Sequence, residues 1–278
     1  MREGDGAEQS RPGKVSGIPE EDSSPVGGVL PGLKVLVYHK VALGTPDKDY
    51  LWAVSQSRLR QHLRFLMRSG YSTVTLRNVS DFLDGRAELP PKPVLITFDD
   101  GFGETGEIIL STFNEFGSKA TVFVLGAFEP PEWERVREFK REEMMDREQI
   151  RKLHSAGFEI GSHSMTHSDL RSLPNDEVRK EMSDSKRALE NLLQDEIISF
   201  AYPYGAVNET IERLASETGY RYGCGVYSGP PKFGTDIYDI RRIPVTLGTT
   251  SRHLAIKMTM PYEYYAWLRF KIGRTLGR

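Results

Sequence analysis

Two carboxylates stand side by side in the segment TFDDGF, residues 97–102, where an apolar run ends. Neighbouring carboxylates repel each other, so the pair Asp99 and Asp100 indicates a positive charge beside it. Two histidines, His163 and His167, stand four residues apart in GSHSMTH, residues 161–167. Two neutral imidazoles and one carboxylate suit a divalent ion such as zinc and leave positions open for water. The second aspartate is then available to accept a proton from that water.

The spacing of the two histidines allows a single helical turn to bring both imidazoles onto one face. It is not the metalloprotease HExxH pattern, because residue 164 is Ser and supplies no base. Taken alone, an Asp-Asp pair is most often a cap or a turn, and an HxxxH spacing is usually a surface coincidence. Their joint occurrence at strand ends is a far stricter condition, and it favours a site.

Short apolar segments alternate with amphipathic ones along most of the chain. We expect strands at 34–38, 73–76, 94–98, 120–124, 158–161, 197–202, 221–226 and 240–245, and helices near 55–70, 78–84, 104–116, 146–157, 175–194 and 208–218. Seven or eight strands that are each followed by a helix predict a parallel sheet. A single distorted (β/α)7-8 barrel fits this length, and an open doubly wound sheet is the alternative.

The barrel has a consequence for the site, because residues just past the ends of parallel strands meet at one mouth. The aspartate pair follows the strand 94–98, and the histidine pair follows the strand 158–161. We therefore expect all four side chains at the same rim.

These residues also resemble a known family. TFDDG (97–101) and HSMTH (163–167) are similar to the first two motifs of the polysaccharide deacetylases, the carbohydrate esterase family 4 or NodB-homology enzymes, and FAYPYG (200–205) is similar to a variant of the third. The resemblance covers residues 34 to 245. It implies a distorted β/α barrel that removes N-acetyl groups from amino sugars with a divalent metal. The donor set of two imidazoles and one carboxylate favours Zn²⁺ as that metal.

The same resemblance assigns roles by position. It implies that Asp100, His163 and His167 hold the metal and that Asp99 is the general base. The backbone around Tyr204 would help to bind the oxyanion of the tetrahedral intermediate.

Two departures from the family pattern have candidate replacements. Many members carry an arginine in the third motif that orients the base, and Ala201 occupies that place here. Arg242 in IRRIPV is the candidate, as in the subgroup that carries FAYPYG. Its neighbour Arg241 would point to the opposite face of a strand.

The late histidine motif is not evident either. His39 follows the first strand, and the YH pair resembles the N-terminal histidine of the subgroup that deacetylates exported poly-N-acetylglucosamine. We expect His39 to protonate the leaving amine, with His253 as the reserve candidate.

Four aromatic residues could belong to the hydrophobic core or could stack on the sugar rings of a substrate. Three are expected near the mouth as substrate contacts: Tyr202, Tyr204 and Phe102. The fourth, Trp133, lies in a charged insertion, residues 129–145, that would lengthen the rim.

Composition limits the other possibilities. The 278 residues carry a formal net charge of −2, which gives no electrostatic reason to expect a nucleic-acid partner. The single cysteine, Cys224, excludes an internal disulfide and a cysteine-based zinc cluster.

Three segments are expected: a disordered lead over 1–31, the barrel over 32–260, and a basic amphipathic tail over 261–278. The lead lacks the apolar stretch of a secretory signal, and the tail could lie on an anionic membrane surface. We therefore expect a cytoplasmic protein. For the tail, two alternatives stay open: peripheral membrane contact, or a last helix that covers the barrel and continues into a frayed basic end.

The function that these observations favour is the metal-dependent removal of N-acetyl groups from an amino sugar, with an N-acetylated glycan as the substrate. Two alternatives stay open. One is an amidohydrolase for another N-acyl substrate, such as a formamido sugar or a small-molecule amide. The other is a carbohydrate-binding pseudoenzyme that keeps the barrel without turnover.

Overall fold

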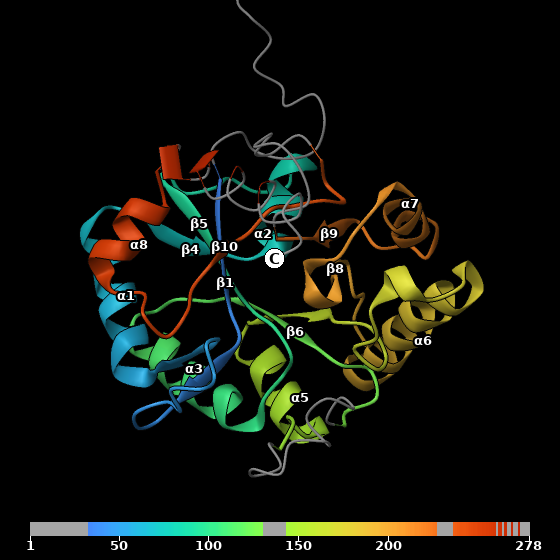
Figure 1. Ribbon diagram of the computed structural model, residues 1–278, viewed down its shortest axis with the longest axis horizontal. Coiled ribbons are helices and arrows are strands. Elements are labelled where there is room, and N and C mark those ends of the chain that lie inside the picture. Colours follow the sequence, from blue (N-terminus) through green and yellow to red (C-terminus); the bar gives the residue numbers. More distant parts are fainter. Residues whose placement is uncertain are drawn as a thin grey trace, which may run out of the picture.

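Eight parallel strands form the sheet that carries the expected site (Figure 1). Their order is β10-β1-β5-β6-β7-β8-β9, with β4 paired to the first half of β5. The strands are β1 (Lys34–Tyr38), β4 (Ser72–Val74), β5 (Pro93–Phe98), β6 (Thr121–Val124), β7 (Glu159–Ser162), β8 (Ser199–Ala201), β9 (Tyr222–Cys224) and β10 (Ile243–Pro244). The computed structural model describes residues 33–129, 143–226 and 236–259, together with 261, 262, 264, 265, 268 and 272.

The sheet curls towards closure through the segment that leads into β10. Ile240 forms a parallel bridge with Cys224 at the end of β9, and β10 then pairs with β1. One short stretch of chain therefore contacts both ends of the strand order. The prediction of a distorted β/α barrel is confirmed, in the form of a curled parallel sheet with helices outside.

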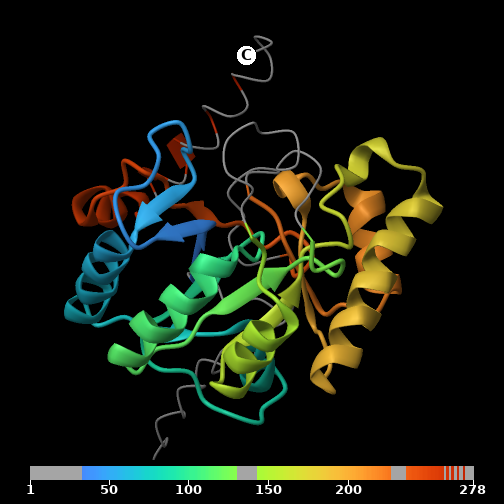
Figure 2. The same cartoon turned by 90° about the horizontal axis from the view of Figure 1, so that it is seen from below.

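Helices surround this sheet, most of them on its outer surface. They are α1 (Gln56–Arg68), α2 (Leu76–Leu83), α3 (Gly103–Glu115), α5 (Arg147–Ser155), α6 (Asn175–Leu193), α7 (Glu209–Glu217) and α8 (Ser251–Lys257), with short 3-10 turns η1 (Leu170–Ser172) and η2 (Pro203–Gly205). Figure 2 shows α3, α5 and α6, in green and yellow, along the outside of the strands. A reciprocal cap begins α5, because Asp146 accepts from the Gln149 backbone and Gln149 accepts from the Asp146 backbone.

Alternation along the strands divides the apolar residues into two clusters. The larger one lies between the sheet and the helices, and the smaller one fills the inside of the curl. The inner cluster includes Val35, Leu95, Phe123 and Tyr222. Because apolar side chains fill the inside of the curl, polar groups that point inward at the strand ends are held in a dry environment.

A two-stranded sheet beside the mouth was not expected from the sequence. It joins β2 (Lys40–Ala42) to β3 (Ala53–Ser55), and residues 43–52 connect the two strands. Leu247 N donates to Leu51 O at 2.9 Å, which ties this connection to the segment after β10. The loop therefore has a defined position next to the end of β1.

Three sequence expectations fall largely outside the described residues. They are the lead over 1–31, most of the charged insertion with Trp133, and most of the tail over 261–278. Within the described residues, no helix combines the length and the apolar character needed to cross a membrane.

Candidate active site

The chain turns sharply after β5, and this turn presents the two aspartates. Asp100 has φ of 74° and Gly101 has φ of 80°, both in the left-handed region. A Cβ on residue 101 would lie 3.1 Å from a side-chain carbon of Val124, so glycine also allows a close approach of β6. Asp99 and Asp100 are each 3% exposed. The turn therefore orients two buried carboxylates at the ends of the strands.

The two histidines meet through a turn, and the prediction of a helical turn is wrong here. Ser164 has φ of 67° and His167 has φ of 64°, and neither value occurs in a right-handed helix. The Ser164 hydroxyl accepts from the His167 backbone N–H at 3.0 Å. The four-residue spacing brings the imidazoles together all the same, with ring centroids of His163 and His167 4.8 Å apart.

Glu181 on α6 fixes this turn, a role that the sequence analysis missed. Its carboxylate accepts from the backbone N–H groups of Met165 and Thr166, each at 2.9 Å, and from the Thr166 hydroxyl at 2.8 Å. A charged acceptor on a helix therefore positions a strained backbone segment. In the sequence, Glu181 is one of several acidic residues on the polar face of a helix, so nothing marked it.

Asp100, His163 and His167 form a buried cluster with the chemistry of a metal site. Asp100 Oδ1 lies 3.3 Å from His163 Nε2 and 3.4 Å from His167 Nε2, and the three atoms that could bind an ion lie within 4.8 Å of one another. The other ring nitrogen of His163, Nδ1, is 2.8 Å from the Ala201 carbonyl oxygen. A carbonyl only accepts, so Nδ1 carries a proton, and Nε2 is the ring nitrogen that would bind an ion. The donor set and its outer contact therefore fit a divalent ion.

The charges of this cluster are strongly coupled. Burial opposes ionisation of Asp100, but hydrogen bonds from His163 and His167 outweigh it and hold the pKa of this carboxyl far below its usual value. Burial likewise opposes the charged form of His163, and its contact with Asp100 raises the imidazole pKa overall. A cation is therefore favoured beside Asp100.

Asp99 faces a different partner. The Arg242 guanidinium donates to both of its carboxylate oxygens, at 2.6 and 2.7 Å, and also to the Thr97 hydroxyl at 3.2 Å and the Gly225 carbonyl at 3.0 Å. Burial opposes ionisation of Asp99, yet Arg242 and then His163 keep the pKa of the carboxyl below its usual value. The guanidinium thus lies in the mouth, as predicted, while Arg241 points to Asp239.

Thr97 is a second residue of the site that the sequence analysis missed, although the strand pattern could have identified it. It precedes Asp99 by two residues on a strand, so both side chains must lie on the same face. Its hydroxyl donates to the Leu36 carbonyl at 2.9 Å, which leaves the oxygen to accept from Arg242.

His39 lies directly after β1, at the same rim. Its Nδ1 is buried and has no hydrogen-bond partner within the described part of the chain. Burial lowers the pKa of the imidazole, although the charges of Asp100 and then Asp99 act in the opposite direction. The ring also contacts Trp52 of the β2–β3 connection, with centroids 4.8 Å apart. An imidazole with an unpaired nitrogen therefore lies near both aspartates.

The three aromatic residues expected to contact substrate separate into two groups. Tyr204 is 59% exposed, and its ring lies 4.7 Å from that of His167. It also has φ of 61°, so η2 presents its backbone in a left-handed turn. Tyr202 and Phe102 are 0% and 1% exposed, which leaves no ring surface for a sugar. The prediction that those two side chains contact substrate is therefore corrected: both belong to the core.

The remaining histidines lie elsewhere. His62 is buried between β1 and the segment after β10, where its ring nitrogens contact the Tyr38 hydroxyl and the Thr249 carbonyl. His253 takes part in the cap of α8 and contacts the Gly248 carbonyl at 2.9 Å. His154 pairs with Asp195.

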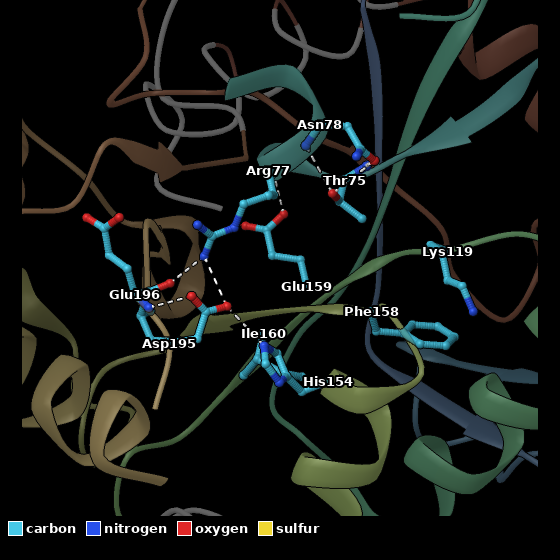
Figure 3. Close-up of a pocket in the computed structure, with 12 residues that line it drawn as sticks. Thr75, Arg77, Asn78, Lys119, His154, Phe158, Glu159, Ile160, Asp195 and Glu196 are labelled. Carbon is cyan, nitrogen blue, oxygen red and sulfur yellow. Dashed lines mark hydrogen bonds and ion pairs between the residues drawn. The ribbon is translucent and has the colours of Figure 1, made fainter. Parts of the chain in front are cut away.

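A cavity of about 340 Å³ opens at the other end of the strands (Figure 3). Its wall includes Glu159, the first residue of β7, whereas His163 follows the last residue of that strand. His154 and Asp195 also line it. Because none of its lining residues belongs to the cluster at the mouth, this cavity is separate from the candidate site.

Comparison with known proteins agrees with this geometry. A family model described as "Polysaccharide deacetylase" matches residues 86–223, about half of the chain. The chain belongs to the polysaccharide deacetylase family. The Bacillus subtilis protein YxkH, named as a polysaccharide deacetylase, is 27% identical over 216 residues, which are 78% of this chain and 72% of the relative. A peptidoglycan-N-acetylglucosamine deacetylase of Bacillus cereus is 28% identical over 133 residues, 47% of this chain and 44% of the relative.

Solved structures show the same fold. The Streptococcus pyogenes deacetylase PplD, in complex with acetate, aligns with a TM-score of 0.69 and 21% identity over 82% of this chain and 98% of its own. IcaB from Ammonifex degensii aligns with a TM-score of 0.67 and 24% identity over 84% of this chain and 98% of its own. At these identities the likeness establishes the curled β/α architecture.

Proposed function

We propose that this protein is a metal-dependent hydrolase that removes N-acetyl groups from an amino sugar within a glycan. Its membership of the polysaccharide deacetylase family supports the reaction class. Similarity to a peptidoglycan-N-acetylglucosamine deacetylase supports an acetamido sugar as the substrate. The buried cluster at the mouth supplies side chains suited to the reaction.

Asp100, His163 and His167 would hold one divalent ion. Two imidazole nitrogens and one carboxylate oxygen favour zinc over magnesium or calcium, which prefer oxygen ligands. A bound ion of this kind lowers the pKa of water towards neutrality and polarises the amide carbonyl. The three side chains are pre-arranged for it, since Glu181 and the Ala201 carbonyl already fix the positions of the two imidazoles.

Asp99 is the proposed general base. Arg242 keeps it ionised at neutral pH and fixes the plane of its carboxylate through two hydrogen bonds. Each carboxylate oxygen retains a second lone pair, so the contact with Arg242 leaves Asp99 able to accept a proton from the attacking water. Arg242, directly before β10, would thus replace the arginine that the third motif lacks at Ala201.

His39 and Tyr204 complete the proposed reaction. His39 would donate a proton to the departing sugar nitrogen, since an amine leaves poorly unless it is protonated. The left-handed turn at Tyr204 would direct its backbone N–H at the oxyanion of the tetrahedral intermediate.

One observation carries this proposal: the adjacent residues Asp99 and Asp100 have different charged partners. Asp99 is paired with a guanidinium, whereas Asp100 contacts two imidazoles. Asp100 is therefore suited to bind a cation together with the two imidazoles, and Asp99 is suited to accept a proton.

Acetate release from a panel of glycans tests the function. The panel contains β-1,4- and β-1,6-linked N-acetylglucosamine oligomers, peptidoglycan fragments, N-formyl sugars and small acyl amides, with chelated and zinc-restored protein. We expect acetate from at least one acetylated sugar, loss with chelator and recovery with zinc. Release restricted to formyl sugars or small amides would favour another amidohydrolase. Glycan binding without any release would indicate a pseudoenzyme.

A further inference from the structure

Two exposed aromatic rings contact histidines of the candidate site. Trp52, at the end of the β2–β3 connection, is 37% exposed, and its ring lies 4.8 Å from that of His39. Tyr204 in η2 is 59% exposed, and its ring lies 4.7 Å from that of His167. Each ring therefore combines a contact with the site and a surface open to solvent.

The strand order places these rings on two sides of the cluster. His39 follows β1 and Tyr204 follows β8, while the aspartates follow β5 and His163 follows β7. In the sheet, β5, β6 and β7 lie between β1 and β8. The metal-binding side chains and the proposed base are thus located between an indole and a phenol ring.

The position of Trp52 is defined by backbone contacts on both of its sides. Leu51 O accepts from Leu247 N at 2.9 Å, and Ala53 N donates to Tyr50 O at 3.2 Å. Ala53 is itself 1% exposed and begins β3. Because these contacts already fix the backbone around Trp52, little further backbone freedom is lost when the ring binds a ligand.

The indole contacts His39, and 37% of the residue stays exposed to solvent and available to a ligand. Gluco-configured sugars carry their hydroxyls equatorially, so the faces of the ring are formed by C–H groups that pack against aromatic rings. Large, rigid aromatic side chains provide such contact area at low entropic cost. Two such rings on either side of the reacting groups suit a chain of sugars better than a single sugar.

We propose that Trp52 is a sugar-stacking residue that contacts the sugar next to the reacting unit of the substrate. The proposal rests on the deacetylase function inferred above and adds to it a binding role for Trp52, a residue of the β2–β3 connection outside the cluster of aspartates and histidines.

The test compares Trp52→Ala, Trp52→Phe and the wild type on N-acetylglucosamine, its β-1,4-linked disaccharide and its pentasaccharide. Leu51→Ala is the control, since Leu51 is a neighbouring exposed residue of the same loop. For Trp52→Ala we expect kcat/KM on the pentasaccharide to fall by about tenfold, mainly through KM, and to fall less as the substrate shortens. Phenylalanine should restore most of the loss, and Leu51→Ala should match the wild type.

A loss that is equal for all three substrates would overturn the proposal, because Trp52 would then act through His39. No loss with the pentasaccharide would overturn it as well.

Measurements of binding affinity test the stacking role of Trp52 independently of the proposed deacetylase activity. Pentasaccharide affinity is measured by tryptophan fluorescence and calorimetry in the Asp99→Asn background, with and without Trp52→Phe and Trp52→Ala. Weaker binding in the alanine variant supports the stacking role even if no sugar releases acetate, in which case the deacetylase assignment alone fails. Unchanged affinity would exclude the stacking role.

Discussion

Arg242 donates to both carboxylate oxygens of Asp99, at 2.6 and 2.7 Å, although 143 residues separate them in the chain. Both side chains are buried, at 1% and 3% exposure. A buried ion pair is expensive to desolvate, and removing one partner leaves an uncompensated charge. Its presence at the mouth is therefore best explained by a requirement for a fixed, ionised carboxylate.

The first prediction concerns the pH dependence of turnover. Arg242 lowers the pKa of Asp99, and the base is active only when it is ionised. In Arg242→Met the pKa of Asp99 should rise, so the acidic limb of the kcat/KM profile should move to higher pH by about 1–3 units. Arg241→Met is the matched control, because its guanidinium faces Asp239 at 3.4 Å. An unshifted limb in Arg242→Met would show that another group sets it.

The ion pair between Arg242 and Asp99 should also contribute to the free energy of unfolding. Arg242→Met should lower the free energy of unfolding by about 3–5 kcal/mol, because it leaves Asp99 charged and buried. Adding Asp99→Asn removes that charge, so the double variant should be more stable than Arg242→Met alone. Urea denaturation of the two single variants, the double variant and the wild type measures the coupling. Additive losses would contradict a direct energetic link.

The second prediction separates the two aspartates by metal content. His163→Ala and Asp100→Asn should lose stoichiometric zinc and activity together, since each removes a proposed ligand. Asp99→Asn should keep the metal and lose most of its turnover. Elemental analysis after dialysis against limiting zinc provides the measurement. Metal loss in Asp99→Asn with retention in Asp100→Asn would mean that ligand and base are exchanged.

The third prediction concerns His39. His39→Ala should retain zinc and the fold but lower the rate on acetamido sugars by about 10²- to 10⁴-fold, which is the usual contribution of a positioned acid. The loss should be smaller for acetate esters, whose leaving groups need less protonation. Parallel assays on an N-acetylated and an O-acetylated sugar give the comparison. Equal losses on the two substrates would indicate that His39 acts in binding.

Much of the site could be predicted because strand geometry is regular. Side chains that alternate along β5 must place Thr97 and Asp99 on one face, and parallel strands must end at one mouth. The resemblance to the subgroup that carries FAYPYG supplied Arg242 as the expected partner of Asp99. Strand geometry then separated Arg242 from Arg241, because adjacent residues in extended chain face opposite ways.

The conformations of turns could not be predicted in the same way. Spacing of four residues fits a helical turn, and nothing in the letters HSMTH shows that residues 164 and 167 adopt positive φ. The β2–β3 connection has no apolar periodicity, so its approach to His39 depends on tertiary contacts alone. The burial of Tyr202 and Phe102 likewise follows from packing, since an aromatic residue at a strand end can face either side.

The last prediction concerns His62, which links β1 to the segment after β10. The Thr249 carbonyl can only accept, so His62 Nε2 must carry a proton and donate to it, at 3.0 Å. Nδ1 then accepts from the Tyr38 hydroxyl, also at 3.0 Å. The neutral imidazole satisfies both contacts, whereas protonation of Nδ1 would remove an acceptor inside the core. Burial, the leading cause, lowers the pKa of His62 from 6.5 to about 4.

The sign of the resulting pH dependence follows from the two pKa values. The unfolded chain takes up a proton near pH 6.5, but the folded chain resists protonation until about pH 4. Acid therefore favours the unfolded state in this window, and the free energy of unfolding should fall by roughly 3 kcal/mol as the pH drops through it.

The variant His62→Gln tests this pH dependence, because glutamine does not titrate. Its free energy of unfolding should be lower than that of the wild type at neutral pH, but should fall by roughly 3 kcal/mol less between pH 6.5 and 4. Urea denaturation in the presence of a chelator measures both slopes without a contribution from bound metal. If His62→Gln retained the wild-type slope, the acid sensitivity of the fold would have another origin.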